Sequence, residues 1–223
     1  MTIVLDAGHG GAEEGALGPT GLKEKEISLS LVLRVKTLLE KEGNLRVLLT
    51  RPDDRTVALK DRPAIANQEK AALFLSIHLN ASPGADSHGS ETYYLGRMSD
   101  NDSTARLVAA ENAGVVNDKD GPQLVLWDMA QNASLKDSAA LAGAVQKQMN
   151  DLLATPDRGV KQAPFAVLKG SRVPAVLVEV AFISNPQEEN KLKSGEFLDK
   201  AAAAIGTAIK NYLKLRGEVV SAH

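Results

Sequence analysis

Cysteine is missing from all 223 residues of the chain. Without thiols the protein can use neither a cysteine nucleophile nor a thiolate metal ligand, and it can form no disulfide bond. A cysteine-free chain is compatible with an oxidising compartment and equally with a reducing one. Any catalysis or metal binding therefore depends on other side chains.

Aromatic residues, an excess of one charge and long apolar runs are also scarce. Aromatics make up 4% of the chain, so the core must be aliphatic. The formal net charge is −2 with basic and acidic residues interspersed, which argues against a nucleic-acid partner because such proteins carry a basic stripe or patch. No apolar run approaches the roughly 18 residues of a membrane helix, so we expect no transmembrane segment.

Hydrophobic residues alternate along the chain between the pattern of buried strands and that of amphipathic helices. Strands are predicted at residues 2–7, 45–51, 72–78, 90–95, 165–168 and 175–182, and helices at 24–42, 56–68, 141–152, 185–190 and 197–212. The strands are nearly continuously apolar, which favours parallel strands covered on both faces. We therefore predict one α/β domain over residues 1–216, with a twisted, mostly parallel central sheet of about six strands flanked by helices on both faces. The tail at 217–223 is expected to be frayed.

Two of the four histidines follow apolar runs and stand in turns rich in glycine or asparagine. His9 lies in IVLDAGHGG and His78 in LFLSIHLNAS. The ligand sites of open α/β sheets lie beyond the carboxyl ends of the strands, so both are candidate metal ligands. With one carboxylate they would form a catalytic zinc site that keeps one position open, but each could equally be structural. Asp6 and Asn80 are candidates to orient the two rings.

Glu179 interrupts the segment VPAVLVEVAFI, which is otherwise apolar on both faces. Burying a carboxylate costs several kcal/mol unless the group is paired or lies beside a metal. One interpretation is a structural ion pair with an arginine such as Arg51 or Arg62. The other is a general base at the end of a strand, with a pKa raised by apolar surroundings.

Six segments with family-like spacing carry a resemblance to known enzymes. They are IVLDAGHGG, GLKEKEISL, VLLTRPDD, LFLSIHLNAS, GSETYYL and PAVLVEVAFISNPQEE, in this order. Together they closely resemble the zinc-dependent N-acetylmuramoyl-L-alanine amidases of bacteria, with a catalytic domain of the AmiA/AmiB/AmiC type. The resemblance extends from Ile3 to about Tyr212.

The resemblance implies a zinc ion, Zn²⁺, held by the histidine of the DxGHGG turn, the glutamate of an E-K pair and the histidine of S-I-H-x-N-A. These match His9, Glu24 and His78. Glu26 competes with Glu24 because KEKE offers two carboxylates, and spacing alone does not choose between them. Without the motif, Glu24 would simply be an acidic residue that favours a helix N-terminus. The glutamate of the L-V-E strand matches Glu179, which implies a base that takes a proton from water and delivers it to the departing amine.

Residues 96–134 are a candidate regulatory insert. In division-associated members of the family, an inserted helical segment covers the zinc until an activator protein displaces it. Glu111 aligns with the glutamate that can reach the metal in such members, so our hypothesis is that it occupies the open zinc position in the resting state. A solvated helix glutamate is the alternative. Within the insert, residues 115–123 are expected to form a mobile loop, and Trp127 to pack in the core or to line a partner surface.

The leading functional hypothesis is an amidase that cuts the bond between N-acetylmuramic acid and the L-alanine of the peptide stem, with peptidoglycan as substrate. A zinc peptidase or deacylase acting on another amide is one alternative. A wall-binding module without activity is another, but it predicts a lost ligand or a lost glutamate. The family implies an extracytoplasmic location, in the periplasm or cell wall. Met1 directly precedes the first strand, so we expect no signal peptide in this chain.

Overall fold

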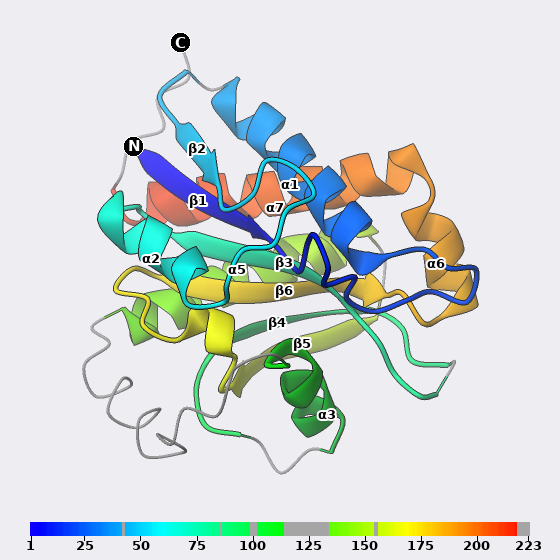
Figure 1. The fold of residues 1–223 in the computed structure, drawn as a ribbon. Coiled ribbons are helices and arrows are strands. Elements are labelled where there is room, and N and C mark those ends of the chain that lie inside the picture. The colour runs from blue at the N-terminus through cyan, green and yellow to red at the C-terminus, as the bar shows by residue number, and fades with distance from the viewer. Residues whose placement is uncertain (42, 85, 99–101, 114–133, 154–155, 218–223) are drawn as a thin grey trace.

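The computed structural model describes residues 1–41, 43–84, 86–98, 102–113, 134–153 and 156–217. Within these residues, six strands form one sheet in the order β2-β1-β3-β6-β4-β5 (Figure 1). The strands are β1 (Thr2–Ala7), β2 (Arg46–Leu49), β3 (Phe74–Asn80), β4 (Ser90–Leu95), β5 (Asp157–Ala163) and β6 (Ala175–Phe182). Neighbours are parallel except β4 and β6, which are antiparallel. The prediction of a mostly parallel sheet of about six strands is confirmed.

Helices cover both faces of the sheet. They are α1 (Glu24–Glu40), α2 (Asp61–Gln68), α3 (Asp102–Glu111), α5 (Leu135–Leu153), α6 (Pro186–Leu192) and α7 (Gly195–Leu215), with a short 3₁₀ turn η1 (Ala166–Leu168). The larger core packs α1, α5 and α7 against one face, and a smaller core packs α2, α3 and η1 against the other. No helix within the described ranges combines the length and the apolar character needed to cross a membrane.

The register of the strands determines which polar side chains meet. Successive residues of a strand point to opposite faces, so Leu75 and Ile77 enter the larger core while His78 faces the side of α2 and α3. His78 pairs with Glu179 in the β3–β6 register, and Glu179 pairs with Glu91 in the β6–β4 register. These three residues form a row across the sheet, which we call the His78–Glu179–Glu91 row. It lies toward the carboxyl ends of β3 and β6, as the sequence predicts for a site in this fold class.

Two segments differ from the sequence prediction. Residues 165–168 form no strand: Phe165 stacks edge-on against Tyr93, with ring centroids 4.9 Å apart, and the chain continues into the η1 turn. The sixth strand is β5 instead, which the sequence does not reveal because its residues are polar and partly exposed at the edge of the sheet.

The helix predicted at 56–68 begins only at Asp61, with Pro63 in its first turn as expected. The residues before it bind the glycine turn after β1. Asp54 Oδ1 accepts a hydrogen bond from the Gly11 amide at 2.7 Å, and Thr56 Oγ1 donates to the Gly10 carbonyl at 3.3 Å.

The loop predicted at 115–123, Trp127 and most of the tail at 217–223 lie outside the described residues. Of the candidate insert at 96–134, the structure describes residues 96–98 and 102–113 together with Ser134.

Candidate metal centre

His9 sits in a tight turn directly after β1. Its φ is +58°, a left-handed conformation that is uncommon outside glycine, and it is followed by Gly10 and Gly11 with φ of +124° and +60°. Two buried arginines hold the backbone of this turn. Arg62 Nη2 donates to the His9 carbonyl at 3.0 Å, and Arg51 Nη2 donates to the Gly8 carbonyl at 2.8 Å. Hydrogen bonds from the two arginines thus stabilise the strained backbone of this turn. Strained residues of this kind cluster at functional sites.

Glu24 is the first residue of α1 and is fully buried. Its Oε2 accepts from the Ala16 amide at 2.8 Å, and its Oε1 accepts from the Leu79 amide at 3.0 Å. Glu26, two residues later, is exposed. Of the two carboxylates in KEKE, the structure therefore directs only Glu24 inward.

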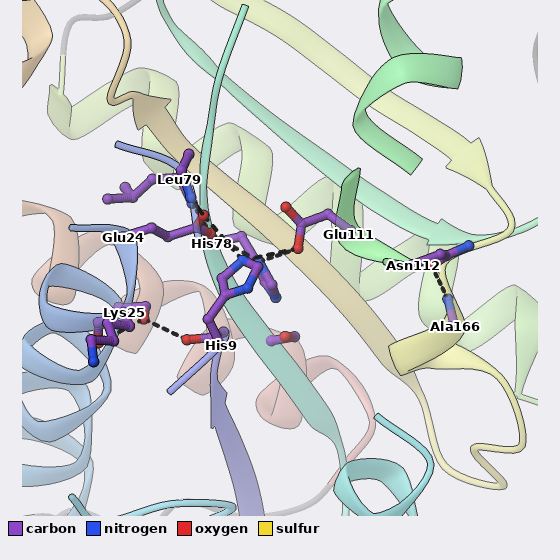
Figure 2. Close-up of polar contacts among 12 residues, drawn as sticks. His9, Glu24, Lys25, His78, Leu79, Glu111, Asn112 and Ala166 are labelled. Carbon is purple, nitrogen blue, oxygen red and sulfur yellow. Dashed lines mark hydrogen bonds and ion pairs between the residues drawn. The ribbon is translucent and has the colours of Figure 1, made fainter. Parts of the chain in front are cut away.

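Four side chains converge beyond the ends of β1 and β3: His9, Glu24, His78 and Glu111, each offering a ligand atom within 4.8 Å of the others (Figure 2). His9 Nε2 lies 3.1 Å from Glu24 Oε2 and 3.2 Å from Glu111 Oε2, yet it makes no hydrogen bond with either oxygen. His78 Nδ1 lies 3.0 Å from Glu24 Oε1 and 2.8 Å from Glu111 Oε2. The cluster unites the three ligands expected from the motifs with Glu111.

Two carboxylates facing two imidazoles shift the pKa of every member. Burial alone would lower the pKa of His9, but Glu111 and Glu24 outweigh it and raise the pKa to about 9. Burial likewise opposes the protonated form of His78, while the Glu111 and Glu24 carboxylates raise its pKa well above the usual value. Burial would raise the pKa of Glu111, but His78 holds it below its ordinary range. The site is built to hold positive charge between two carboxylates.

The donor set fits a zinc ion. Zinc in proteins binds imidazole nitrogen and carboxylate oxygen at about 2.0–2.2 Å, so four tetrahedral ligand atoms lie roughly 3.3 Å apart. The closest contacts in the cluster, 2.8 to 3.2 Å, are slightly shorter than that spacing. His9 Nε2 is buried without a hydrogen bond, which leaves its lone pair available for coordination.

Two glycines leave space for the ligands. A Cβ built on Gly8 would lie 2.5 Å from Cε1 of the His78 ring. A Cβ on Gly15 would lie 2.6 Å from Glu24 Oε2 and 2.6 Å from His9 Cδ2. No side chain larger than hydrogen fits at either position while the cluster keeps its geometry.

Glu179 lies beside the cluster on β6 and is fully buried. Neither of its carboxylate oxygens has a hydrogen-bond partner. Burial, with the nearby negative charge of Glu111, raises the pKa of Glu179 well above its ordinary value. The expected alternative, an ion pair with Arg51 or Arg62, is wrong, because Arg51 donates to backbone carbonyls and Arg62 pairs with Asp6.

Asp6 and Asn80 do not orient the histidines. Asp6 accepts from Arg62 Nη1 at 2.9 Å and from Ser76 Oγ at 2.5 Å, underneath the turn that carries His9. Asn80 Nδ2 donates to Glu91 Oε1 at 2.6 Å. Both expectations are wrong because each polar group is already used by a partner on a neighbouring strand or helix.

Sequence reasoning missed Glu91, which is buried next to Glu179 on β4. Besides Asn80, its Oε1 accepts from the Tyr93 hydroxyl at 2.7 Å. Its Oε2 accepts from Arg158 Nε at 3.1 Å and from Lys161 Nζ. One feature of the sequence could have indicated it. Residues two apart on a strand share a face, so GSETYYL places Glu91 on the same face as Tyr93.

Sequence reasoning also missed Asn112, which follows Glu111 at the end of α3. Its Nδ2 donates to the Pro164 carbonyl at 3.1 Å, and its Oδ1 accepts from the Ala166 amide at 2.7 Å (Figure 2). The end of α3 is therefore attached to the segment between β5 and η1. This attachment holds Glu111 next to the other three candidate ligands.

A cleft of about 500 Å³ opens beside the cluster. Its lining residues include the ligand candidates His9, His78 and Glu111, together with Leu59 from the loop before α2 and Arg106 and Ala110 from α3. The cleft thus leaves room for a bound molecule next to the candidate metal ligands.

Comparison with known proteins agrees with this geometry. Residues 3–211 match the family model described as N-acetylmuramoyl-L-alanine amidase. The chain is 37% identical over 220 residues to N-acetylmuramoyl-L-alanine amidase AmiC of Escherichia coli O6:H1, covering 95% of this chain and 52% of that protein. It therefore spans about half the length of that relative.

Two solved structures share the fold. The catalytic domain of CwlV, an N-acetylmuramoyl-L-alanine amidase from Bacillus (Paenibacillus) polymyxa var. colistinus, superposes with a TM-score of 0.74 at 31% identity, covering 96% of this chain and 98% of that one. The CwlD amidase of Clostridioides difficile, solved in complex with the GerS lipoprotein, gives a TM-score of 0.75 at 28% identity, covering 96% and 98%.

Proposed function

The chain belongs to the N-acetylmuramoyl-L-alanine amidase family, and from that premise we propose that it hydrolyses the amide between N-acetylmuramic acid and the L-alanine of the peptide stem in peptidoglycan. The observation that carries the proposal is Glu179. It is a fully buried carboxylate without a hydrogen-bond partner, next to a cluster of four potential metal ligands. A group so costly to bury is expected where it performs chemistry.

The proposed metal is Zn²⁺, held by His9, Glu24 and His78. When bound, such an ion supplies Lewis-acid polarisation of the amide carbonyl and makes nearby water more acidic. The backbone amides on Glu24 and the donors on the His9 turn hold the ligands in position before the metal arrives. A ligand shell fixed in this way loses little freedom on binding.

Glu179 is proposed to move the protons. As the base it removes a proton from the attacking water, and as the acid it then delivers a proton to the departing amine nitrogen. Its surroundings favour this double role because burial raises its pKa well above the ordinary value and no neighbouring donor fixes either oxygen. Acid–base help of this kind is typically worth about 10²–10⁴ in rate.

Glu111 is proposed to take the fourth ligand position in the resting state. Its side chain is 8% exposed and its Oε2 lies within 3.2 Å of both histidines, so it stands where a substrate carbonyl or water would approach. Removal of Glu111 from this place would need a movement of the end of α3. An activator protein that binds the 96–134 segment is the proposed cause of that movement.

The proposed working place is outside the cytoplasmic membrane, where peptidoglycan lies. The test is the zinc content of the purified protein together with the release of peptide stems from purified peptidoglycan. The proposal expects one zinc ion per chain and stems with a free L-alanine amine. Hydrolysis of simple peptides but not of peptidoglycan would instead support a zinc peptidase, and binding to peptidoglycan without release would support a wall-binding module.

A further inference from the structure

Two cations of the edge strand β5 point to the same face, although residues three apart point to opposite faces of a regular strand. Between the flanking pairs of the β4–β5 register, the single residue Glu91 faces two residues, Arg158 and Gly159. Gly159 has a φ of +81°, as found where a strand carries an extra residue. This bulge turns Arg158 and Lys161 together toward Glu91.

The resulting cluster carries more positive than negative charge. Glu91 is 2% exposed and accepts from both Arg158 Nε and Lys161 Nζ through a single oxygen, Oε2. Its other oxygen is occupied by Asn80 and Tyr93. One carboxylate therefore anchors two cations, and one positive charge is left without a counter-charge in the cluster.

The Arg158 side chain is fixed in place while its two terminal nitrogens stay free to bind a ligand. The guanidinium carbon lies 4.7 Å from the centroid of the Phe182 ring, and Nε is fixed by Glu91. Among the described residues, Nη1 and Nη2 have no hydrogen-bond partner, and the side chain is 30% exposed. A planar guanidinium with two free donors matches the two oxygens of a carboxylate.

The position relative to Glu179 suits the substrate. Arg158 continues the His78–Glu179–Glu91 row by one strand, so with strands about 4.8 Å apart it stands roughly 10 Å from Glu179 along the sheet. Two residues of extended peptide span roughly 7 Å. The cleft next to His9 lies at the other end of the row, which leaves the Arg158 end for the part of the substrate beyond the scissile amide.

We propose that Arg158 and Lys161, anchored on Glu91, form a carboxylate-binding subsite for the stem residue that follows L-alanine. The proposal rests on the proposed amidase function, and it makes the pair a determinant of specificity for an anionic stem. A stem whose second residue carries a carboxamide in place of the carboxylate loses the bidentate contact. It is then bound more weakly, although the amide to be cut is unchanged.

The test uses two muramoyl-peptides that differ only in a free carboxylate or a carboxamide on the second stem residue. Wild-type enzyme is expected to prefer the free acid by about tenfold in kcat/KM, mainly through KM, the factor that corresponds to about 1.4 kcal/mol. Arg158→Gln should abolish the preference. Arg158→Lys should restore only part of it, because lysine keeps the charge but not the fork. Arg172→Gln changes an exposed arginine just before β6, at the end of that strand away from Glu179; it is the matched control and should keep the preference.

A binding measurement separates this proposal from the proposed function. The released stem peptides, as acid and as amide, are titrated into each variant by calorimetry, which needs no turnover. Thermal unfolding of each variant confirms that it is folded. Equal binding of acid and amide to the wild type would overturn the subsite, whether or not the amide is hydrolysed. A tenfold preference in binding without any cleavage would support the subsite and refute the amidase activity.

Discussion

The Arg62 guanidinium joins the Asp6 carboxylate to the strained turn of His9. Nη1 donates to Asp6 Oδ1 at 2.9 Å, Nη2 donates to the His9 carbonyl at 3.0 Å, and both residues of the ion pair are almost fully buried. The pair therefore supports the turn that carries His9 but is not itself part of the candidate metal centre. Its loss should affect stability before it affects chemistry.

Asp6→Asn should lower the free energy of unfolding by roughly 3–5 kcal/mol, because it leaves the Arg62 charge buried without a counter-charge. Chemical denaturation at pH 7 measures the effect. The matched control is Asp199→Asn, which removes an exposed partner of Arg34 and should leave stability nearly unchanged. Equal decreases in the free energy of unfolding of the two variants would show that the buried pair stabilises the fold no more than the exposed one.

The same pair predicts a dependence on pH. Burial would raise the pKa of Asp6, but Arg62, with Ser76 and Thr50, outweighs it and holds the pKa below its ordinary value. A carboxyl with a lowered native pKa contributes stability that is complete above the unfolded pKa, about 3.9, and is lost as the pH falls through the native pKa. The Tm of the wild type should therefore fall more steeply below about pH 4 than that of Asp6→Asn. Parallel curves would contradict the assignment.

Glu179→Gln should abolish hydrolysis while the protein keeps its fold and its metal. The loss in kcat is expected to be about 10²–10⁴ or more, since the amide can neither take nor deliver the proton. The metal-free variant should also unfold at a higher temperature than the metal-free wild type, because a neutral amide costs less to bury than an unpartnered carboxylate. Stem release by a zinc-loaded Glu179→Gln protein at the wild-type rate would remove Glu179 from the mechanism.

Gly8→Ala should damage the metal centre through sterics alone. The added methyl group meets the His78 ring at 2.5 Å, so the ring must move away from the other ligands. We expect a lower zinc content and a loss of about 1–3 kcal/mol in stability from overpacking. Gly143→Ala is the control: no atom lies within 4 Å of the new methyl group on α5, and removing a helical glycine should stabilise the protein by up to about 1 kcal/mol.

Glu111→Gln and Asn112→Ala should both raise basal activity if Glu111 holds the fourth ligand position. The first weakens the ligand, and the second releases the end of α3 from the Pro164 carbonyl and the Ala166 amide. The increase should be larger for Glu111→Gln, and zinc content should stay at one ion per chain in both. Glu26→Gln, which alters an exposed carboxylate on α1 outside both the cluster and the cleft, is the control and should leave activity unchanged. Unchanged basal release of stems from purified peptidoglycan by Glu111→Gln would refute the resting-state role.

The sequence predicts those site residues whose positions are fixed by their own strand or helix. The two histidines follow from the rule that parallel strands carry their sites at the carboxyl ends, and the structure brings them together with ring centroids 5.2 Å apart. Identifying Glu24 required the family motif, because Glu26 has the same side chain. The two glutamates differ only in which of them lies on the side of α1 that faces the sheet.

The missed features depend on register and on contacts between distant segments. Asp6 pairs with Arg62, which lies on a helix 56 residues further along the chain, so the closeness of Asp6 to His9 in the sequence was misleading. The bulge at Gly159 reverses the side on which Lys161 points, which no alternation pattern shows. Asn112 acts through a backbone turn that was itself predicted as a strand.

The antiparallel direction of β4 determines where the 96–134 segment is connected to the rest of the domain. Because β4 runs against β6, its last residue, Leu95, lies at the amino end of β6, away from the candidate ligands. Ser134, just before α5, donates to the Val173 carbonyl at that same end. The 96–134 segment thus leaves and rejoins the domain on the far side from the candidate metal ligands. Its length can therefore change while the strands next to the candidate metal ligands stay in place.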